Sequence, residues 1–159
     1  MKTIPLTHGR VAFVDDEDFA VLSKHKWHLS DDGYACTTVR HPVDVWRHVR
    51  TSMHRMLLGL VPGDPRQGDH KDRNRLNNQR ANLRIATVGQ NNQNHGTPST
   101  NTSGCKGVTW DKERSKWKAT VYSEGKNRTV GRFTDREDAV NAYKAAVRAH
   151  HGEFACVDD

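Results

Sequence analysis

The sequence predicts an α+β protein built from two small units. Segments of alternating polar and apolar residues, typical of half-buried strands, stand beside segments with apolar residues at helical spacing. Residues 96–104 hold no large apolar side chain and are rich in Gly, Ser, Thr and Asn, which is typical of a linker. We therefore expect one domain over residues 1–95, a linker over 96–104 and a second domain over 105–159.

Composition excludes a membrane-spanning chain and permits a polyanionic partner. Hydrophobic residues make up 34% of the 159 residues, and no apolar run approaches the roughly 18 residues needed to cross a bilayer. The formal net charge of +6 suits an anionic partner. The three cysteines are widely separated and form no Cys-x-x-Cys pair, which favours thiols in a reducing compartment over disulfides or a zinc site. We expect a cytoplasmic protein with no membrane partner.

The first fifty residues predict a small sheet with a short helix. Residues 10–14 are typical of a strand, and the acidic run at 15–18 suits the positive N-terminal end of a helix. A metal site is the alternative reading of that acidic run. Residues 26–29 and 34–38 flank an Asp-Asp-Gly sequence, which predicts two strands joined as a hairpin.

Residues 51–60 predict a helix. Thr51 or Ser52 is suited to cap its start, apolar residues recur along it at helical spacing, and Gly59 marks its end. His54 lies on this helix among basic neighbours. A contact with phosphate and an ordinary packed or solvated histidine both fit that position.

Residues 67–95 carry the most chemically informative pattern. Strand, tight loop, strand over 83–87 and a helix beginning at Gln90 would bring Asp69 and His70 close to the start of that helix. Carboxylate and amide oxygens are hard ligands that suit Mg²⁺, Mn²⁺ or Ca²⁺ better than zinc. A neutral histidine beside them can take a proton from water. This pattern favours metal-assisted phosphodiester hydrolysis over a plain Asn-rich loop.

The order and spacing of these residues resemble the HNH nuclease motif in its His-Asn-Asn form. Asp69 precedes His70, Asn82 follows twelve residues after His70, and Asn91 follows nine residues after Asn82. The likeness covers about residues 51–95. This form of the motif is the one found in phage and intron-encoded homing endonucleases.

The resemblance implies a ββα-metal finger and a role for each motif residue. His70 would be the general base that activates the attacking water. Asp69 and Asn91 would bind one divalent ion, Mg²⁺ or Mn²⁺, at the scissile phosphate. Asn82 would support catalysis by bracing the loop between the two strands.

Other side chains near the motif are further candidates. The third motif position is often His, and its replacement by the amide of Asn91 favours Mg²⁺ or Mn²⁺ over Zn²⁺. Asn94 and His95 lie within one helical turn and are alternatives to Asn91 as ligand. Arg55 and Arg84 are candidates for DNA phosphate contacts, with ordinary surface arginines as the alternative.

From Lys106 onward the sequence predicts a three-stranded antiparallel sheet packed on one helix. Strands are expected over 107–110, 116–122 and 127–133, and the helix over 135–150. The second strand alternates apolar and polar residues, so one face of the sheet suits the helix and the other is basic.

This region resembles the Apetala-type (ethylene-response-factor) DNA-binding domain over residues 104–154. Lys-Gly-Val at 106–108, Trp-Lys-Ala at 117–119 and Val-Gly-Arg-Phe at 130–133 carry the likeness. Such domains lay their sheet in the major groove of DNA. The resemblance and the basic face together imply DNA contacts by Lys106, Thr109, Lys116, Lys118, Thr120, Tyr122, Asn127, Arg128 and Thr129.

Together the two resemblances imply a metal-dependent, site-selective DNA endonuclease of the phage or mobile-element homing type. The first domain would cut double-stranded DNA and the second would grip it. One motif carries one metal site, so one chain, as a monomer, would cut one strand, and a double-strand break would need a homodimer or sequential nicks. The sequence leaves these alternatives open. The alternatives are a catalytically inactive DNA-binding or regulatory protein that reuses both modules, and a nuclease directed at RNA.

Overall fold

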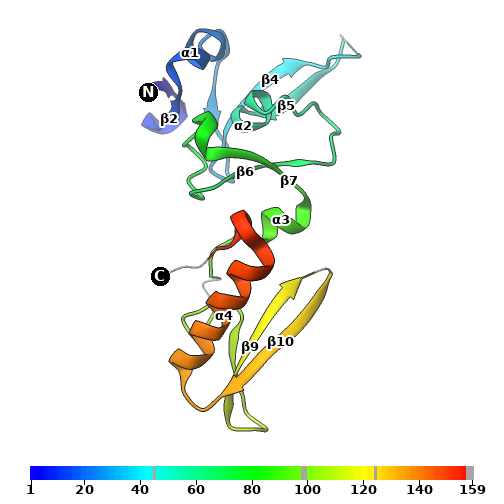
Figure 1. Ribbon diagram of the computed structural model, residues 1–159. Helices are drawn as coiled ribbons and strands as arrows, with labels where there is room; N and C mark the ends of the chain where they lie inside the picture. The colour runs from blue at the N-terminus through cyan, green and yellow to red at the C-terminus, as the bar shows by residue number, and fades with distance from the viewer. Residues whose placement is uncertain (45, 98–99, 124, 157–159) are drawn as a thin grey trace. The chain divides into compact units, whose positions relative to one another are not determined.

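The computed structural model has the mixed α and β structure that the sequence predicts (Figure 1). It groups into two compact units, Met1–Asn91 (unit 1) and Asn92–Asp159 (unit 2). The expected linker at 96–104 includes Pro98 and Ser99, which lie outside the described residues. The structure describes residues 1–44, 46–97, 100–123 and 125–156.

Unit 1 combines small antiparallel sheets with short helices. β1 pairs with β2, β4 lies between β3 and β5, and β6 pairs with β7. The strands are β1 (Lys2–Pro5), β2 (Val11–Val14), β3 (His28–Leu29), β4 (Ala35–Arg40), β5 (His48–Ser52), β6 (Gln67–His70) and β7 (Leu83–Ala86). The helices are α1 (Asp16–Leu22), α2 (Met53–Leu57) and α3 (Val88–Gln93), which begins in unit 1 and ends in unit 2.

Two features of unit 1 differ from the sequence prediction. The expected helix at 51–60 is shorter, because Thr51 and Ser52 are the last residues of β5, where they pair with β4. Strand β1 was not expected, since four residues ending in proline carry little pattern of their own. The hairpin at Gly33 forms as predicted. This residue has a φ of 79°, a left-handed backbone angle that favours glycine over residues with a Cβ atom.

The core of unit 1 includes a residue from the loop between β6 and β7. Trp27 packs in this core and donates from Nε1 to the carbonyl of Leu22 at 2.8 Å. Leu76 brings the loop to the core, and its carbonyl accepts from the backbone N–H of Phe13 at 2.8 Å. The loop is therefore attached to β2. The buried core residues are Ile4, Leu6, Ala12, Val14, Leu22, Trp27, Ala35, Met53 and Leu76.

Unit 2 is the predicted three-stranded sheet with one helix. Its central strand is β9 (Lys116–Ser123), flanked by β8 (Val108–Asp111) and β10 (Lys126–Phe133). Helix α4 (Arg136–His151) packs against this sheet, as Figure 1 shows. The carboxylate of Asp135 accepts from the backbone N–H of Glu137 and caps the helix start, as its position before the helix predicts.

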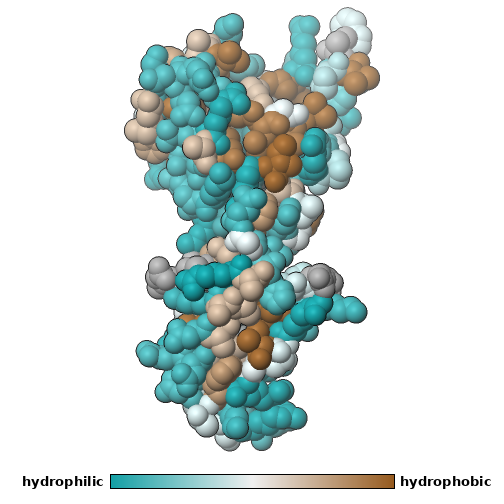
Figure 2. All heavy atoms as spheres, in the orientation of Figure 1, coloured by the Kyte–Doolittle hydropathy of each residue, from teal (hydrophilic) through white to brown (hydrophobic). Residues whose placement is uncertain are grey.

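The core of unit 2 lies between the sheet and α4. On α4, Ala139, Tyr143 and Val147 face the sheet at helical spacing and are buried against Val108, Ala119 and Val121. The face of the protein shown in Figure 2 is mainly hydrophilic. None of the helices in the described ranges has the length and apolar character required to span a membrane.

Candidate active site

Strands β6 and β7 position the first motif residues. Their register pairs Asp69 with Arg84 and His70 with Leu83. Neighbouring residues of a strand point to opposite faces, so the carboxylate and the imidazole lie on different sides of β6. Asp69 is 5% exposed and His70 is 4% exposed. Both side chains are therefore surrounded by other protein atoms and not by solvent.

The ring of His70 is held from two directions. Its Nε2 lies 3.3 Å from Oδ1 of Asn78, and its ring centroid lies 4.8 Å from that of His54 and 6.0 Å from that of Tyr34. Burial lowers the pKa of His70, against the opposing effects of the Asn78 hydrogen bond and of nearby carboxylates. The imidazole is thus neutral at pH 7, which is the form that accepts a proton.

His54 is buried against the same ring. It is the second residue of the short helix α2, and its Nε2 lies 3.3 Å from Oγ of Ser52. Burial, together with the nearby His70 and Arg55, lowers the pKa of His54 to about 3. A Cβ placed on Gly68 would overlap the His54 ring, so the glycine makes room for this histidine beside the motif.

Asp69 forms a buried ion pair. Its Oδ2 accepts from Nε and Nη2 of Arg84, each at 2.8 Å, and both side chains are less than a tenth exposed. The sequence suggests Arg84 as a surface contact for DNA phosphate. In the structure it instead neutralises Asp69 from the neighbouring strand, because the register of β6 and β7 puts the two side by side.

Asn91 approaches the Asp69 side of β6. Its Nδ2 donates to Oε1 of Gln67 at 2.5 Å. Gln67 precedes Asp69 by two residues and shares its face of the strand. A reciprocal pair fixes the start of α3: Gln90 donates from its backbone to Oγ1 of Thr87, and Thr87 donates from its backbone to Oε1 of Gln90.

The donor chemistry at Asp69 and Asn91 fits a hard divalent ion. One carboxylate and one amide oxygen suit Mg²⁺ or Mn²⁺, with water and phosphate oxygens as the remaining ligands. Across the described part of the chain, no three or more His, Cys, Asp or Glu side chains gather as a metal site.

Asn82 joins the two ends of the loop between β6 and β7. Its Nδ2 donates to Oδ1 of Asp72 and to the carbonyl of Asn77, both at 2.8 Å, and its Oδ1 accepts from the backbone of Asp72 at 3.0 Å. Asn74 adds a turn in which its Oδ1 accepts from the backbone of Leu76 at 3.1 Å. The high Asn content of this segment thus reflects side chains that replace backbone partners in a tight loop.

Arg55, a candidate for phosphate contact, makes structural hydrogen bonds with backbone carbonyls. Its guanidinium donates to the carbonyls of Arg66 at 3.0 Å, Val61 at 3.1 Å and Asp64 at 3.3 Å. These bonds hold the segment between α2 and β6. Sequence reasoning cannot find such contacts, because the partners are backbone atoms that any residue supplies.

In unit 2, Lys106 also has backbone partners. Its Nζ donates to the carbonyls of Asn92 at 3.2 Å, Gln93 at 3.3 Å and His95 at 2.7 Å. These are the carbonyls at the C-terminal end of α3, where a cation is favourable. The sequence suggests Lys106 as a DNA contact, and the structure gives its ammonium group this capping role.

The strand register sorts the other candidates of unit 2 by face. Arg128 pairs with the buried Val121, so it lies on the α4 side of the sheet and not on the expected DNA side. The outer face of the sheet is the face directed away from α4. Arg132 lies on this face opposite Lys118 and forms an ion pair with Asp111 at 2.9 Å. The candidates on the outer face are Thr109, Lys116, Lys118, Thr120, Tyr122, Asn127 and Thr129.

Sequence reasoning missed two residues of the His70 environment, Tyr34 and Asn78. Asn78 follows another Asn in a loop, and only the folding of that loop brings it to the imidazole. Tyr34 lies far from His70 in sequence, before β4, whereas His70 ends β6. Its place after the Gly33 turn predicts a strand residue and nothing more.

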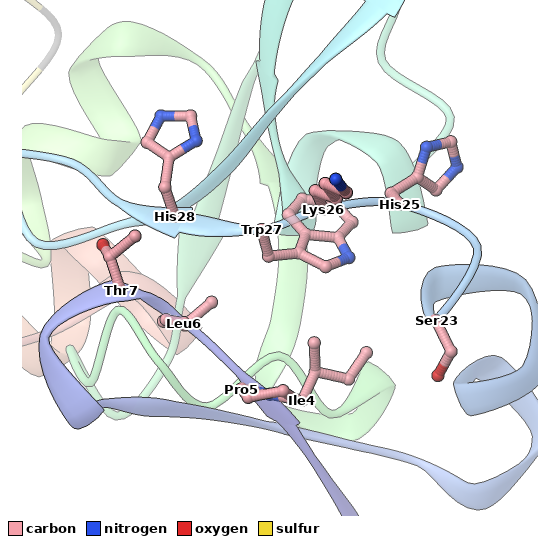
Figure 3. Close-up of a pocket in the computed structure, with 9 residues that line it drawn as sticks. All are labelled: Ile4, Pro5, Leu6, Thr7, Ser23, His25, Lys26, Trp27 and His28. Carbon is pink, nitrogen blue, oxygen red and sulfur yellow. The ribbon is translucent and has the colours of Figure 1, made fainter.

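A cavity of about 670 Å³ lies elsewhere in unit 1, as Figure 3 shows. It contains none of the motif residues. Its walls combine apolar side chains of β1 and Trp27 with Thr7, Lys26 and His28. The motif chemistry is therefore not centred on this cavity.

Comparison with known proteins identifies relatives. The chain is 31% identical over 147 residues to an uncharacterized HNH endonuclease of Acanthamoeba polyphaga mimivirus. The aligned region covers 92% of this chain and 74% of the relative. It is 44% identical over 87 residues to Protein 3.8 of Escherichia phage T7, covering 55% of this chain and 71% of that protein. No protein-family model and no solved structure matches the chain. Since the first likeness extends over most of both chains, including the Asp69–Asn91 segment, this chain belongs to the HNH endonuclease family.

Proposed function

We propose that this protein is a metal-dependent DNA endonuclease with His70 as its general base. The observation that carries the proposal is the neutral imidazole held against Asn78 on a strand–loop–strand–helix unit, beside a carboxylate on the opposite face of β6. The likeness to a named HNH endonuclease supports the same chemistry. A phage or mobile-element origin accords with the viral and phage relatives.

Each motif residue has a specific task in the proposed reaction. With Nε2 of His70 donating to Oδ1 of Asn78, the lone pair of the neutral ring is on Nδ1, which takes the proton of the attacking water. Asp69 and Asn91 would hold one Mg²⁺ or Mn²⁺ ion, which when bound stabilises negative charge on the phosphate oxygens. Asn82 keeps the loop that carries Asn78 in shape.

The proposed substrate is double-stranded DNA, with unit 2 contributing affinity and site selection. Its outer sheet face carries Lys116 and Lys118 together with hydroxyls, an amide and the half-exposed ring of Tyr122. Lysines and hydroxyls on a sheet suit phosphate contacts, and the aromatic ring suits the groove. This proposal keeps the Apetala-type role of unit 2 and a division of labour near residues 96–104.

Incubation with supercoiled plasmid tests the function. We expect cleavage in Mg²⁺, none with EDTA, and loss of cleavage with intact DNA binding in His70→Ala. The matched control is His150→Ala, which removes an exposed histidine on α4 and leaves cleavage unchanged. Cleavage by His70→Ala at the wild-type rate would remove the proposed mechanism. Tight DNA binding without cleavage by the wild type would favour a catalytically inactive DNA-binding protein.

A further inference from the structure

The hairpin of β4 and β5 carries an exposed tryptophan among basic residues. Residues 40–50 contain three arginines, two histidines and one aspartate. Near the turn, Trp46 is 91% exposed and Val43 is 87% exposed. Large apolar side chains at such exposure next to cations are typical of an interaction surface.

Hydrogen bonds join the described residues on either side of Trp46. Oδ1 of Asp44 accepts from the backbone N–H of Trp46 at 3.3 Å. The backbone N–H of His41 donates to the carbonyl of Arg47 at 2.8 Å, and Nδ1 of His41 accepts from the backbone of Asp44 at 3.1 Å. The aspartate is therefore engaged by the turn itself, and the arginines dominate the charge presented outward.

One face of the hairpin forms a continuous basic strip. Thr38 pairs with Arg50 and Arg40 pairs with His48, so these four exposed side chains lie on the same face. The next pair on that face, Cys36 with Ser52, is buried where the hairpin joins the rest of unit 1. The strip thus runs from the turn to the body of unit 1, and Figure 1 shows β4 and β5 extending away from α1 and β2.

The inner end of the strip shares a cavity with Tyr34, a ring neighbour of the candidate general base. A cavity of about 290 Å³ is lined by Arg50, Ser52 and Tyr34, among others. Nη2 of Arg50 lies 3.7 Å from Sγ of Cys36 at this cavity. The Tyr34 ring lies 6.0 Å from that of His70. Arg50 of the basic strip and the Tyr34 ring next to the imidazole therefore line the same cavity.

We propose that the β4–β5 hairpin is a DNA-binding arm that holds the duplex beside the cut. Arg40, Arg47 and Arg50 contact phosphates, and Trp46 lies against the groove as an apolar wedge. Charge complementarity selects the polyanionic duplex over a second copy of this basic chain. The inference rests on the proposed nuclease function, and it assigns to unit 1 a DNA contact separate from the sheet of unit 2.

The test measures binding of a short duplex by the full-length chain in the His70→Ala background. We expect the combined variant Arg40→Gln/Arg47→Gln/Arg50→Gln to bind about tenfold or more weakly. The slope of log affinity against log salt should become shallower by about 0.9 for each phosphate that the variant no longer neutralises. Trp46→Ala is expected to weaken binding by about tenfold. Matched controls elsewhere in unit 1 are Lys24→Gln for charge and Val21→Ala for an exposed apolar side chain.

The outcomes separate the arm from the nuclease. Hairpin variants that bind with wild-type affinity and salt dependence would overturn the arm, even where the wild type cleaves DNA. Weakened binding by the hairpin variants supports the arm even if the wild type fails to cleave, in which case only the nuclease proposal falls. A dimer in sedimentation that Trp46→Ala dissociates, with DNA binding unchanged, would assign the turn to self-association and overturn the proposal.

Discussion

The side-chain oxygen of Asn78 lies 3.3 Å from Nε2 of His70, and both residues are buried. The backbone N–H of Asn78 donates to the carbonyl of Phe13 at 2.8 Å, so the residue that orients the imidazole is itself anchored to β2. Within the described residues, Nδ2 of Asn78 is buried without a hydrogen-bond partner.

Asn78→Ala is expected to lower kcat by about 10²-fold with DNA affinity unchanged, because the imidazole loses the acceptor that fixes its tautomer. Asn78→Asp retains an acceptor oxygen and adds a negative charge. We expect it to recover much of the rate and to move the acid limb of the pH–rate profile to higher pH. Single-turnover kinetics over a range of pH measures both effects. Equal rates for Asn78→Ala and the surface control Asn141→Ala would contradict the positioning role.

Arg84→Gln is expected to destabilise the metal-free protein by about 3 kcal/mol, because it leaves the buried carboxylate of Asp69 without its cation. Mg²⁺ bound at Asp69 would replace the missing charge, so we expect added Mg²⁺ to stabilise this variant more than the wild type. Urea unfolding in EDTA measures the loss of stability, and urea unfolding in Mg²⁺ measures the gain on adding the ion. Arg148→Gln, an exposed position on α4, is the control. Identical stability of the two variants in EDTA would show that the ion pair is dispensable.

Gly68→Ala is expected to lower stability by about 1–3 kcal/mol, because the new methyl group overlaps the buried His54 ring and approaches Cδ1 of Leu58 to 3.0 Å. Gly89→Ala is the matched control. In α3 the added methyl meets only Oγ1 of Thr87 at 3.9 Å, so a gain of about 0.5–1 kcal/mol is expected there. Thermal unfolding of the two variants measures the contrast, and a neutral Gly68→Ala would mean that the His54 ring can move aside.

Stability is expected to fall as the pH is lowered, because His54 is buried in its neutral form. Its folded pKa of about 3 lies below the unfolded value of 6.5, so between these values the unfolded chain binds a proton that the folded chain excludes. The groups around it are the His70 and Tyr34 rings and Arg55, and the lowered pKa of His70 acts in the same direction.

The expected loss from His54 alone is about 1.4 kcal/mol between about pH 7.5 and about pH 5.5. Urea unfolding at the two pH values measures it. His54→Gln should reduce this pH dependence, since glutamine does not titrate. A wild-type stability that stays constant over this range, or one that rises on acidification, would refute the assignment.

Lys118→Gln is expected to weaken duplex binding several-fold and to make its salt dependence shallower by about one neutralised phosphate, because Lys118 lies on the outer sheet face of unit 2. Arg128→Gln removes the same charge from the α4 side of the same sheet. It is expected to leave the salt dependence unchanged. Fluorescence anisotropy with a labelled duplex distinguishes the two, and a larger effect for Arg128→Gln would reverse the assignment of the faces.

The elements of unit 2 and the strand–loop–strand–helix segment around the motif could be predicted from sequence, because both have strong local patterns. The alternation in β9 and the helical spacing in α4 each define a buried face without reference to the rest of the chain. Strand β5 could not be predicted, because its partner is β4 and its own five residues carry only a weak pattern.

The environment of the motif was less predictable than its residues. Asp69 and His70 stand out in sequence by type and spacing, whereas the partner of Asp69 follows from strand register fifteen residues away. Arg55 is a candidate for phosphate contact by its charge, and Lys106 is a candidate for DNA contact by its position in the Apetala-type resemblance. Their backbone partners depend on where the chain turns, which residue type alone does not encode.

The attachment of the motif loop to β2 has a consequence for protein engineering. The segment that bears the HNH signature is not structurally independent. Asn78, whose side chain orients the imidazole, is hydrogen-bonded through its backbone to Phe13 of β2, near the start of the chain. A minimal nuclease excised from this protein, or a graft of its motif onto a foreign scaffold, would have to include β2 as well. Without it, every signature residue would be retained and the proton acceptor would still be misaligned.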